Sequence, residues 1–189
     1  MRTEGFDELL ATLKRASAAL REEGIPFLLG GGLACWVRGG PESDHDLDLM
    51  VKEEDAERAL DVLARLGMLP EKPPEGWLYK AWDGGVLVDI IFRPSGFDIT
   101  DEVIERGEDL EVVSTPMRVM RLEDVFAAKL LALDEHSLDY DSLLEMARPV
   151  REQVDWDEVR ARTSDSAYAS AFFTLVEGLG VVEPPPTGK

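Results

Sequence analysis

Apolar residues recur every three or four positions in much of the chain, the spacing of one face of a helix. In Phe6–Glu23 this pattern ends at Gly24 and Pro26, two residues that commonly terminate helices. Asp98–Glu108 is acidic rather than periodic, and is also expected to be helical. The helices predicted in this way are Phe6–Glu23, Leu33–Val37, Glu53–Leu66, Asp98–Glu108, Leu122–Leu133, Tyr140–Ala147, Asp157–Arg162 and Tyr168–Leu179.

Short apolar runs between these stretches predict strands. Two of them, Trp77–Trp82 and Val86–Phe92, flank Asp83-Gly84-Gly85, which is typical of a hairpin turn. Pro70–Glu75 is polar and is predicted to be a loop. The other predicted strands are Phe27–Leu29 and Leu47–Val51, with a short extended region at Glu111–Val113 and Met117–Met120 around Thr115-Pro116.

The order of these elements predicts an α/β (α+β) fold. Helices and strands alternate in the first two thirds, which favours a small mixed β-sheet flanked by helices, whereas the last third is entirely helical. We therefore expect a sheet-containing domain over residues 1–121 and a C-terminal helical subdomain over residues 122–182. The Pro-rich tail, residues 183–189, is expected to be disordered.

The net charge of the chain limits the classes of binding partner that we expect. Its 189 residues carry a formal net charge of −19. Such a field argues against DNA or RNA binding through overall charge, although a local basic groove or a basic protein partner stays open.

The single cysteine, Cys35, excludes an internal disulfide framework. No signal peptide or membrane-length apolar stretch is visible, so we expect a cytoplasmic protein without a membrane partner.

Three carboxylates are the strongest chemical signal. Asp46 and Asp48 alternate with leucines in a predicted strand, so they share one face about 6–7 Å apart. Asp89 is the only charge in Val86–Phe92, and a lone Asp in an apolar strand is rare unless it is paired or metal-bound. If the two strands pair, the three side chains converge. The three carboxylates would then be ligands of Mg²⁺ or Mn²⁺, because divalent cations of this kind prefer carboxylate and phosphate oxygens.

Gly30-Gly31-Gly32 lies between a strand and a helix. Glycines at such a place let backbone N–H groups approach a phosphate, and a helix N-terminus favours negative charge. A plain tight turn would use the same glycines. Their combination with the three carboxylates is much more specific than either feature alone, and it suits a metal-dependent site for phosphoryl or nucleotidyl transfer.

These residues resemble the DNA polymerase β-like nucleotidyltransferase superfamily. The similarity is carried by Gly31-Gly32-Leu33-Ala34, by Ser43–Leu49 with its Asp-x-Asp, and by Asp89. Within the superfamily the chain is most similar to small nucleotidyltransferases related to abortive-infection, type IV toxin–antitoxin toxins. Leu122–Leu130, in which Lys129 follows a Leu-Glu-Asp start, and Asp139-Tyr140 carry this finer likeness.

The resemblance implies roles for individual residues. Asp46, Asp48 and Asp89 would bind the metal ions and act in catalysis. Gly31 and Gly32 would contact the triphosphate, Ser43 would supply a hydroxyl, and Lys129 would bind phosphate or assist catalysis. Asp139 would belong to the nucleotide site, although it also suits the N-cap of the following helix.

The chain departs from its relatives just before the Asp pair. Relatives often carry an Arg-x-Thr-like triplet there, whereas this chain has Glu42-Ser43-Asp44. Two functions are therefore carried forward. The first is metal-dependent transfer of a nucleoside monophosphate to a hydroxyl of an RNA 3′ end, a protein or a small molecule, including the action of a toxin with an antitoxin partner. The second is a catalytically silent nucleotide-binding or protein-interaction module.

Overall fold

The computed structural model describes residues 4–42 and 46–184. Its helices in these ranges are α1 (Glu4–Glu22), α2 (Gly31–Trp36), α3 (Glu53–Arg65), α4 (Asp101–Glu105), α5 (Leu122–Leu131), α6 (Tyr140–Val150), α7 (Trp156–Arg162) and α8 (Ala167–Gly178). Its strands are β1 (Phe27–Leu29), β2 (Asp46–Val51), β3 (Leu69–Glu71), β4 (Leu78–Asp83), β5 (Val86–Ile91), β6 (Glu108–Val112) and β7 (Thr115–Val119).

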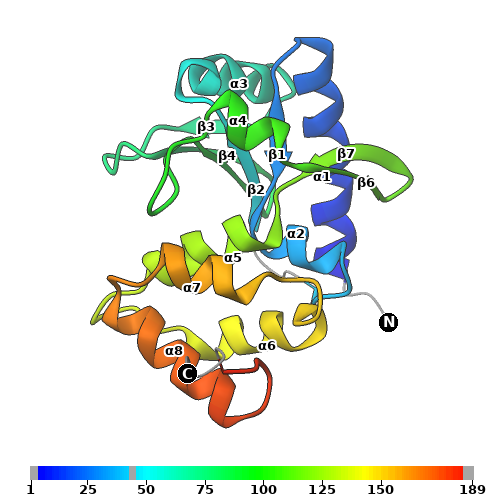
Figure 1. The fold of residues 1–189 in the computed structure, drawn as a ribbon. Coiled ribbons are helices and arrows are strands. Elements are labelled where there is room, and N and C mark those ends of the chain that lie inside the picture. Colours follow the sequence, from blue (N-terminus) through cyan, green and yellow to red (C-terminus); the bar gives the residue numbers. More distant parts are fainter. Residues whose placement is uncertain (1–3, 43–45, 185–189) are drawn as a thin grey trace.

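The strands form one mixed sheet in the order β3-β4-β5-β2-β1-β7-β6. The pairs β2–β5 and β1–β7 are parallel, and the remaining neighbours are antiparallel. Helices α5 to α8 follow the sheet in the chain and pack together at one end of it (Figure 1). The predicted α/β class with a mixed sheet is confirmed. The domain boundary near residue 121 stays a prediction, as does the disordered tail, whose residues from 185 onward lie outside the described ranges.

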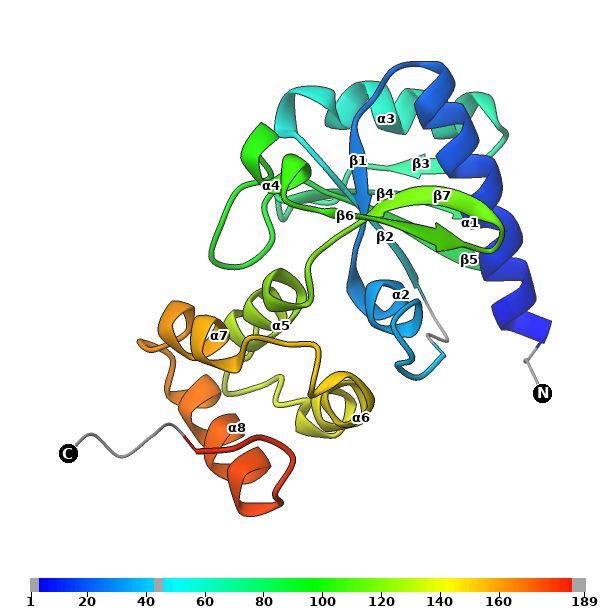
Figure 2. The same cartoon turned by 45° about the vertical axis from the view of Figure 1, so that its right-hand side comes forward.

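The two faces of the sheet differ in what covers them. Helices α1 and α3 pack on one face (Figure 2), and the strand residues at the centre of that face are fully buried. These residues include Leu47 and Leu49 of β2, Val88 and Ile90 of β5, and Ala81 of β4. The alternate residues of the same strands point to the opposite side, because strand side chains alternate. We call this opposite side the site face.

Two details of the sequence-based expectation are wrong. Leu69–Glu71 forms β3, although its polar surroundings and Pro70 favoured a loop. Proline is tolerated there because β3 is an edge strand. The predicted helix Asp98–Glu108 is reduced to α4, since Thr100 caps its start and Glu108 already belongs to β6. The short extended region expected around Thr115-Pro116 is present as β6 and β7, and the turn between these strands lies at Val113-Ser114, both with positive φ.

Candidate active site

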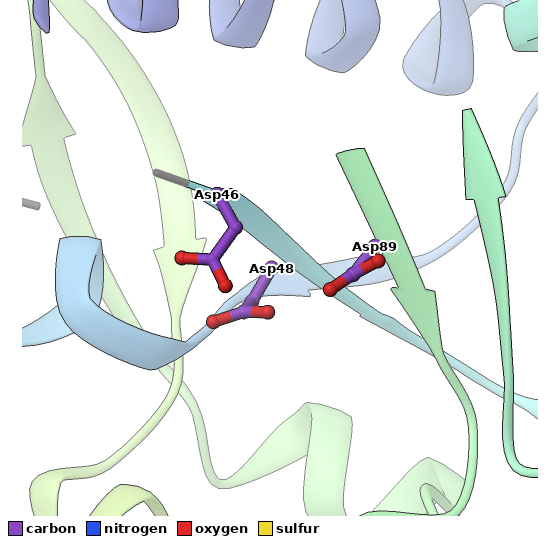
Figure 3. A group of neighbouring side chains, drawn as sticks. All are labelled: Asp46, Asp48 and Asp89. Atoms are coloured by element: carbon purple, nitrogen blue, oxygen red, sulfur yellow. The ribbon is translucent and has the colours of Figure 1, made fainter. Parts of the chain in front are cut away.

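Asp46, Asp48 and Asp89 converge on the site face (Figure 3). Parallel pairing of β2 with β5 sets Asp48 directly beside Asp89. Asp46 lies two residues before Asp48 in β2, so its side chain points to the same face. One carboxylate oxygen from each residue lies within 4.8 Å of the others. The predicted convergence of the three side chains is therefore present in the structure. Three acidic oxygens this close suit a divalent cation, which needs oxygen ligands.

The carboxylates repel one another in a poorly hydrated place. Burial, followed by the charge of Asp46, raises the pKa of Asp48 from 3.8 to about 7. Burial also raises the pKa of Asp89, while Lys80 acts to lower it. The pKa of Asp48 is raised because the cluster lacks enough positive charge to offset its burial and its two neighbours. A divalent cation would supply that charge, so the residues present fit a metal site.

Glycines let the chain pass close to this cluster. The N–H of Gly30 donates to the carbonyl of Asp48 at 2.9 Å, which ties the start of α2 to β2. Gly31 has φ of +55°, and a Cβ placed on it would lie 1.6 Å from Oδ2 of Asp48. The first N–H groups of α2 have no partner within the helix, as in any helix. The backbone of Gly31 and Gly32 therefore lies beside the carboxylates with donors suited to a phosphate.

Lys129 faces the carboxylates from α5. It lines the same cavity as Asp46, Asp48 and Asp89, and its charge acts to lower the pKa of Asp48. Among the residues that the structure describes, no carboxylate forms an ion pair with Lys129. A lysine that carries its charge into an acidic cavity without a partner is available to an anionic ligand such as a phosphate.

The start of α5 holds the helix in place. Asp124 is fully buried and accepts from Arg106 at 2.6 Å and from Arg162 at 2.7 Å. Glu123 accepts from the N–H of Asp155 at 2.9 Å. The Leu-Glu-Asp start of this helix thus joins α5 to α4 and α7. These residues therefore hold the helix that carries Lys129.

The cavity between the site face and α5 has a volume of about 240 Å³. Its lining includes the three carboxylates, Lys129 and Gly31. The other lining residues, most of them apolar, are Met50, Trp77, Ile91, Pro94, Ser95, Met120, Val125, Ala128 and Ala132. A cavity that offers both charged and apolar contacts suits a ligand that has charged and apolar groups, as a nucleotide has.

Lys80 is a residue of the site that the sequence did not reveal. It stands opposite Asp89 in the antiparallel pair β4–β5, and its Nζ lies 3.3 Å from Oδ1 of Asp89. Glu71 of β3 stands opposite Lys80 in turn. A row of charges, Glu71, Lys80, Asp89 and Asp48, therefore crosses four adjacent strands. Only the register of the hairpin at Asp83-Gly84-Gly85, which sets Lys80 against Asp89, distinguishes Lys80 from other charged residues of half-exposed strands.

Two predicted residues lie elsewhere or cannot be placed. Asp139 is exposed and accepts from the N–H of Ser142 at 3.1 Å, so it caps α6, and it is not among the residues that line the cavity. Ser43 lies outside the described residues, as do Asp44 and His45. Glu42 is exposed at the end of the described segment before them. The roles expected of Asp139 and Ser43 stay predictions.

Known structures share this fold. The crystal structure of ANT(2″)-Ia in complex with adenylyl-2″-tobramycin has a TM-score of 0.64 at 20% identity, covering 86% of this chain and 98% of that one. A putative nucleotidyltransferase, TM1012 of Thermotoga maritima, has a TM-score of 0.55 at 19% identity, covering 78% and 92%. The lincosamide antibiotic adenylyltransferase LnuA, in its lincomycin-bound crystal structure, has a TM-score of 0.55 at 12% identity, covering 76% and 97%.

At these identities the structural neighbours show the fold alone. Comparison with curated proteins gives no match. No helix of the described ranges has the length and apolar character required to cross a membrane. The sequence pattern of a family described as "uncharacterised nucleotidyltransferase" matches residues 7–176, which is nearly the whole chain. The chain therefore belongs to this family of nucleotidyltransferases.

Proposed function

We propose that this protein transfers a nucleoside monophosphate from a nucleoside triphosphate to a hydroxyl group, with Mg²⁺ or Mn²⁺ held by Asp46, Asp48 and Asp89. The observation that carries the proposal is the convergence of the three carboxylates within 4.8 Å, next to the glycines of α2. Membership of a nucleotidyltransferase family supports the reaction type. When bound, the metal ion would supply positive charge that stabilises the transferred phosphoryl group and its leaving pyrophosphate.

The residues of the chain divide the remaining tasks. The N–H groups of Gly31 and Gly32 would bind the β- and γ-phosphates, and Lys129 would neutralise phosphate charge from the α5 side of the cavity. Asp89 stands on β5, farther from α2 than Asp48 does, and would orient the acceptor hydroxyl and take its proton. Lys80 would hold the carboxylate of Asp89 in position.

A small-molecule acceptor has more support than an RNA 3′ end. An RNA site needs free basic side chains, but several arginines that might supply it are paired with carboxylates. The pairs are Arg38–Glu108, Arg93–Glu53, Arg118–Asp109 and Arg121–Glu158. Of the structural neighbours, ANT(2″)-Ia is bound to adenylyl-2″-tobramycin and LnuA to lincomycin, both small molecules.

Label transfer tests the proposal. The wild type is incubated with Mg²⁺, each of the four α-³²P-labelled nucleoside triphosphates, and tobramycin or lincomycin as trial acceptors. We expect consumption of the triphosphate and release of pyrophosphate with at least one nucleotide. The Asp48→Asn variant keeps the shape of the side chain and should lose this activity. Equal turnover in the wild type and in Asp48→Asn would contradict the assignment of the metal site.

A catalytically silent module of the same fold is the second candidate. The sequence feature that favours it is Glu42, which stands where relatives often have a basic residue. This candidate includes a role through protein contact, as one half of a toxin–antitoxin pair. It predicts that Mg²⁺ and triphosphates leave the melting temperature unchanged, whereas binding to the folded state would raise it. Label transfer to any acceptor would exclude it.

A further inference from the structure

The in-line geometry of phosphoryl transfer assigns a side of the sheet to the acceptor. This inference rests on the proposed function. The attacking and leaving oxygens lie on opposite sides of the transferred phosphorus. If pyrophosphate leaves toward Gly31 and α2, the acceptor has to approach from across Asp89. The strands in that direction are β5, β4 and β3, in this order.

The site face of these three strands is open next to Asp89. Leu69 of β3 is opposite Trp82 of β4, and Trp82 is opposite Leu87 of β5, so the three side chains form a row on the site face. Leu69 is 71% exposed and Trp82 is 37% exposed. The opposite face of the same strands is buried under α1 and α3. With Glu71, these residues form what we call the acceptor shelf: Leu69, Glu71, Trp82 and Leu87.

The polar group of the shelf is a carboxylate with no cationic partner. Nε1 of Trp82 donates to Oε2 of Glu71 at 3.1 Å, which fixes the indole beside the acid. Lys80 lies opposite Glu71 in the register, but its Nζ contacts Asp89. No arginine or lysine of the described ranges forms an ion pair with Glu71. An exposed indole beside an unpaired carboxylate is a combination that recognises an ammonium group, through cation–π attraction and a charged hydrogen bond.

We propose that the acceptor shelf binds the acceptor, and that the acceptor is a small hydroxylated ring compound carrying ammonium groups. The ring would lie against Trp82 and Leu87, an ammonium group would bind Glu71, and a neighbouring hydroxyl would reach Asp89. The net charge of −19 also attracts cations to the protein. A phosphate backbone would instead be repelled by Glu71, so the shelf favours an amino sugar over an RNA.

Two matched sugars test this proposal by binding alone. The β-1,4-linked glucosamine trisaccharide and cellotriose differ only at C2, where the first has an ammonium group and the second a hydroxyl. Calorimetric titration of the full chain should give about tenfold tighter binding of the glucosamine trisaccharide, as expected for one cation–π contact with one charged hydrogen bond. Equal affinity for the two sugars, or binding of neither, would overturn the proposal.

Two variants locate the effect. Glu71→Gln keeps an oxygen that accepts from the indole of Trp82 but loses the charge, so it should reduce the preference for the charged sugar to the part that the cation–π contact supplies. Trp82→Ala should weaken the binding of both sugars. Glu111→Gln, an exposed carboxylate on β6 at the other edge of the sheet, is the matched control and should behave as the wild type. Circular dichroism checks that each variant is folded.

The outcome is separable from that of the proposed function. An undiminished preference for the charged sugar in Glu71→Gln, or tighter binding of a single-stranded RNA oligonucleotide than of the sugar, would overturn the acceptor shelf. Turnover of Mg²⁺–triphosphate would still report on the metal site in either case. Conversely, absence of triphosphate turnover by the wild type would contradict the proposed function, while the sugar titration would still report on the acceptor shelf.

Discussion

Gly31 lies so close to Asp48 that no side chain fits between them. A Cβ on Gly31 would be 1.6 Å from Oδ2 of Asp48, and the φ of +55° at Gly31 is a conformation that other residues rarely adopt. The contact joins the backbone proposed to bind phosphate to a carboxylate proposed to bind metal. It fixes both groups relative to each other before any ligand is present.

Gly31→Ala should therefore remove activity. The new methyl group has to displace Asp48, and a displacement of about 1 Å in an active site costs on the order of a hundredfold in rate. The measurement is Mg²⁺-dependent turnover of triphosphate, with circular dichroism to confirm folding. Gly178→Ala is the control, because nothing lies within 4 Å of a Cβ at that position. Activity of Gly31→Ala close to that of the control would show that the contact is dispensable.

The raised pKa of Asp48 predicts how pH affects stability and metal binding. In the metal-free protein its pKa is about 7, against 3.8 for the unperturbed group. Between these values the folded state holds more proton than the unfolded state, so this group lowers the free energy of unfolding as pH rises from about 4 to about 7. Metal binding requires the ionised carboxylate, so the affinity for Mg²⁺ should rise over the same interval.

Melting temperatures with and without excess Mg²⁺ check this prediction. The increase caused by Mg²⁺ should be larger at about pH 8 than at about pH 5.5, because protons compete with the metal for Asp48 at the lower pH. In Asp48→Asn this pH dependence should be much reduced. An Mg²⁺ effect of the same size at both pH values would contradict the role of Asp48 as a ligand.

Lys129→Met should weaken binding of the triphosphate. The substitution keeps much of the apolar stem and removes the charge that faces the carboxylates. A lost hydrogen bond to a charged group corresponds to about tenfold to about a hundredfold in affinity. Titration with a non-hydrolysable triphosphate analogue in Mg²⁺ measures it. Lys14→Met, at an exposed position of α1, is the control. An unchanged dissociation constant in Lys129→Met would exclude Lys129 from the phosphate site.

Asp124→Ala should destabilise the fold. The carboxylate is fully buried and accepts from both Arg106 and Arg162. Its removal leaves Arg106 without its carboxylate partner and Arg162 with Glu158 alone. We expect a loss of about 3 kcal/mol in the free energy of unfolding. Urea denaturation measures it. Asp109→Ala removes an exposed pair with Arg118 and should cost far less, because solvent screens exposed pairs. Equal costs for the two variants would contradict the structural role of Asp124.

Much of the fold follows from local patterns in the sequence. The apolar spacing of α1, α3 and α5, and the hairpin turn at Asp83-Gly84-Gly85, are local signals, and the structure contains these elements. Strand β3 could not be predicted from the sequence because it has three residues, one of them Pro70, and pairs only with β4. The turn at Val113-Ser114 could not be predicted because neither residue is a glycine or asparagine, the residues that usually adopt positive φ.

The candidate site divides in the same way. The three carboxylates were recognisable because charge in an apolar strand is unusual, and the parallel pairing of β2 with β5 then brings them together. Lys80 and Glu71 were not recognisable, since charged residues in half-exposed strands are common and only the register shows that they adjoin Asp89. The N-capping bond of Asp139 is likewise a local feature, so the sequence permitted both of its proposed roles.

The most direct test of the account is the position of a bound metal ion. Crystals grown with Mn²⁺ and a non-hydrolysable triphosphate analogue would locate Mn²⁺ by its anomalous scattering. The account predicts one or two peaks within about 2.0–2.4 Å of carboxylate oxygens of Asp46, Asp48 and Asp89, with the triphosphate against Gly31 and Gly32. Triphosphate bound in the cavity without a metal peak at these carboxylates, or Mn²⁺ bound elsewhere, would contradict it.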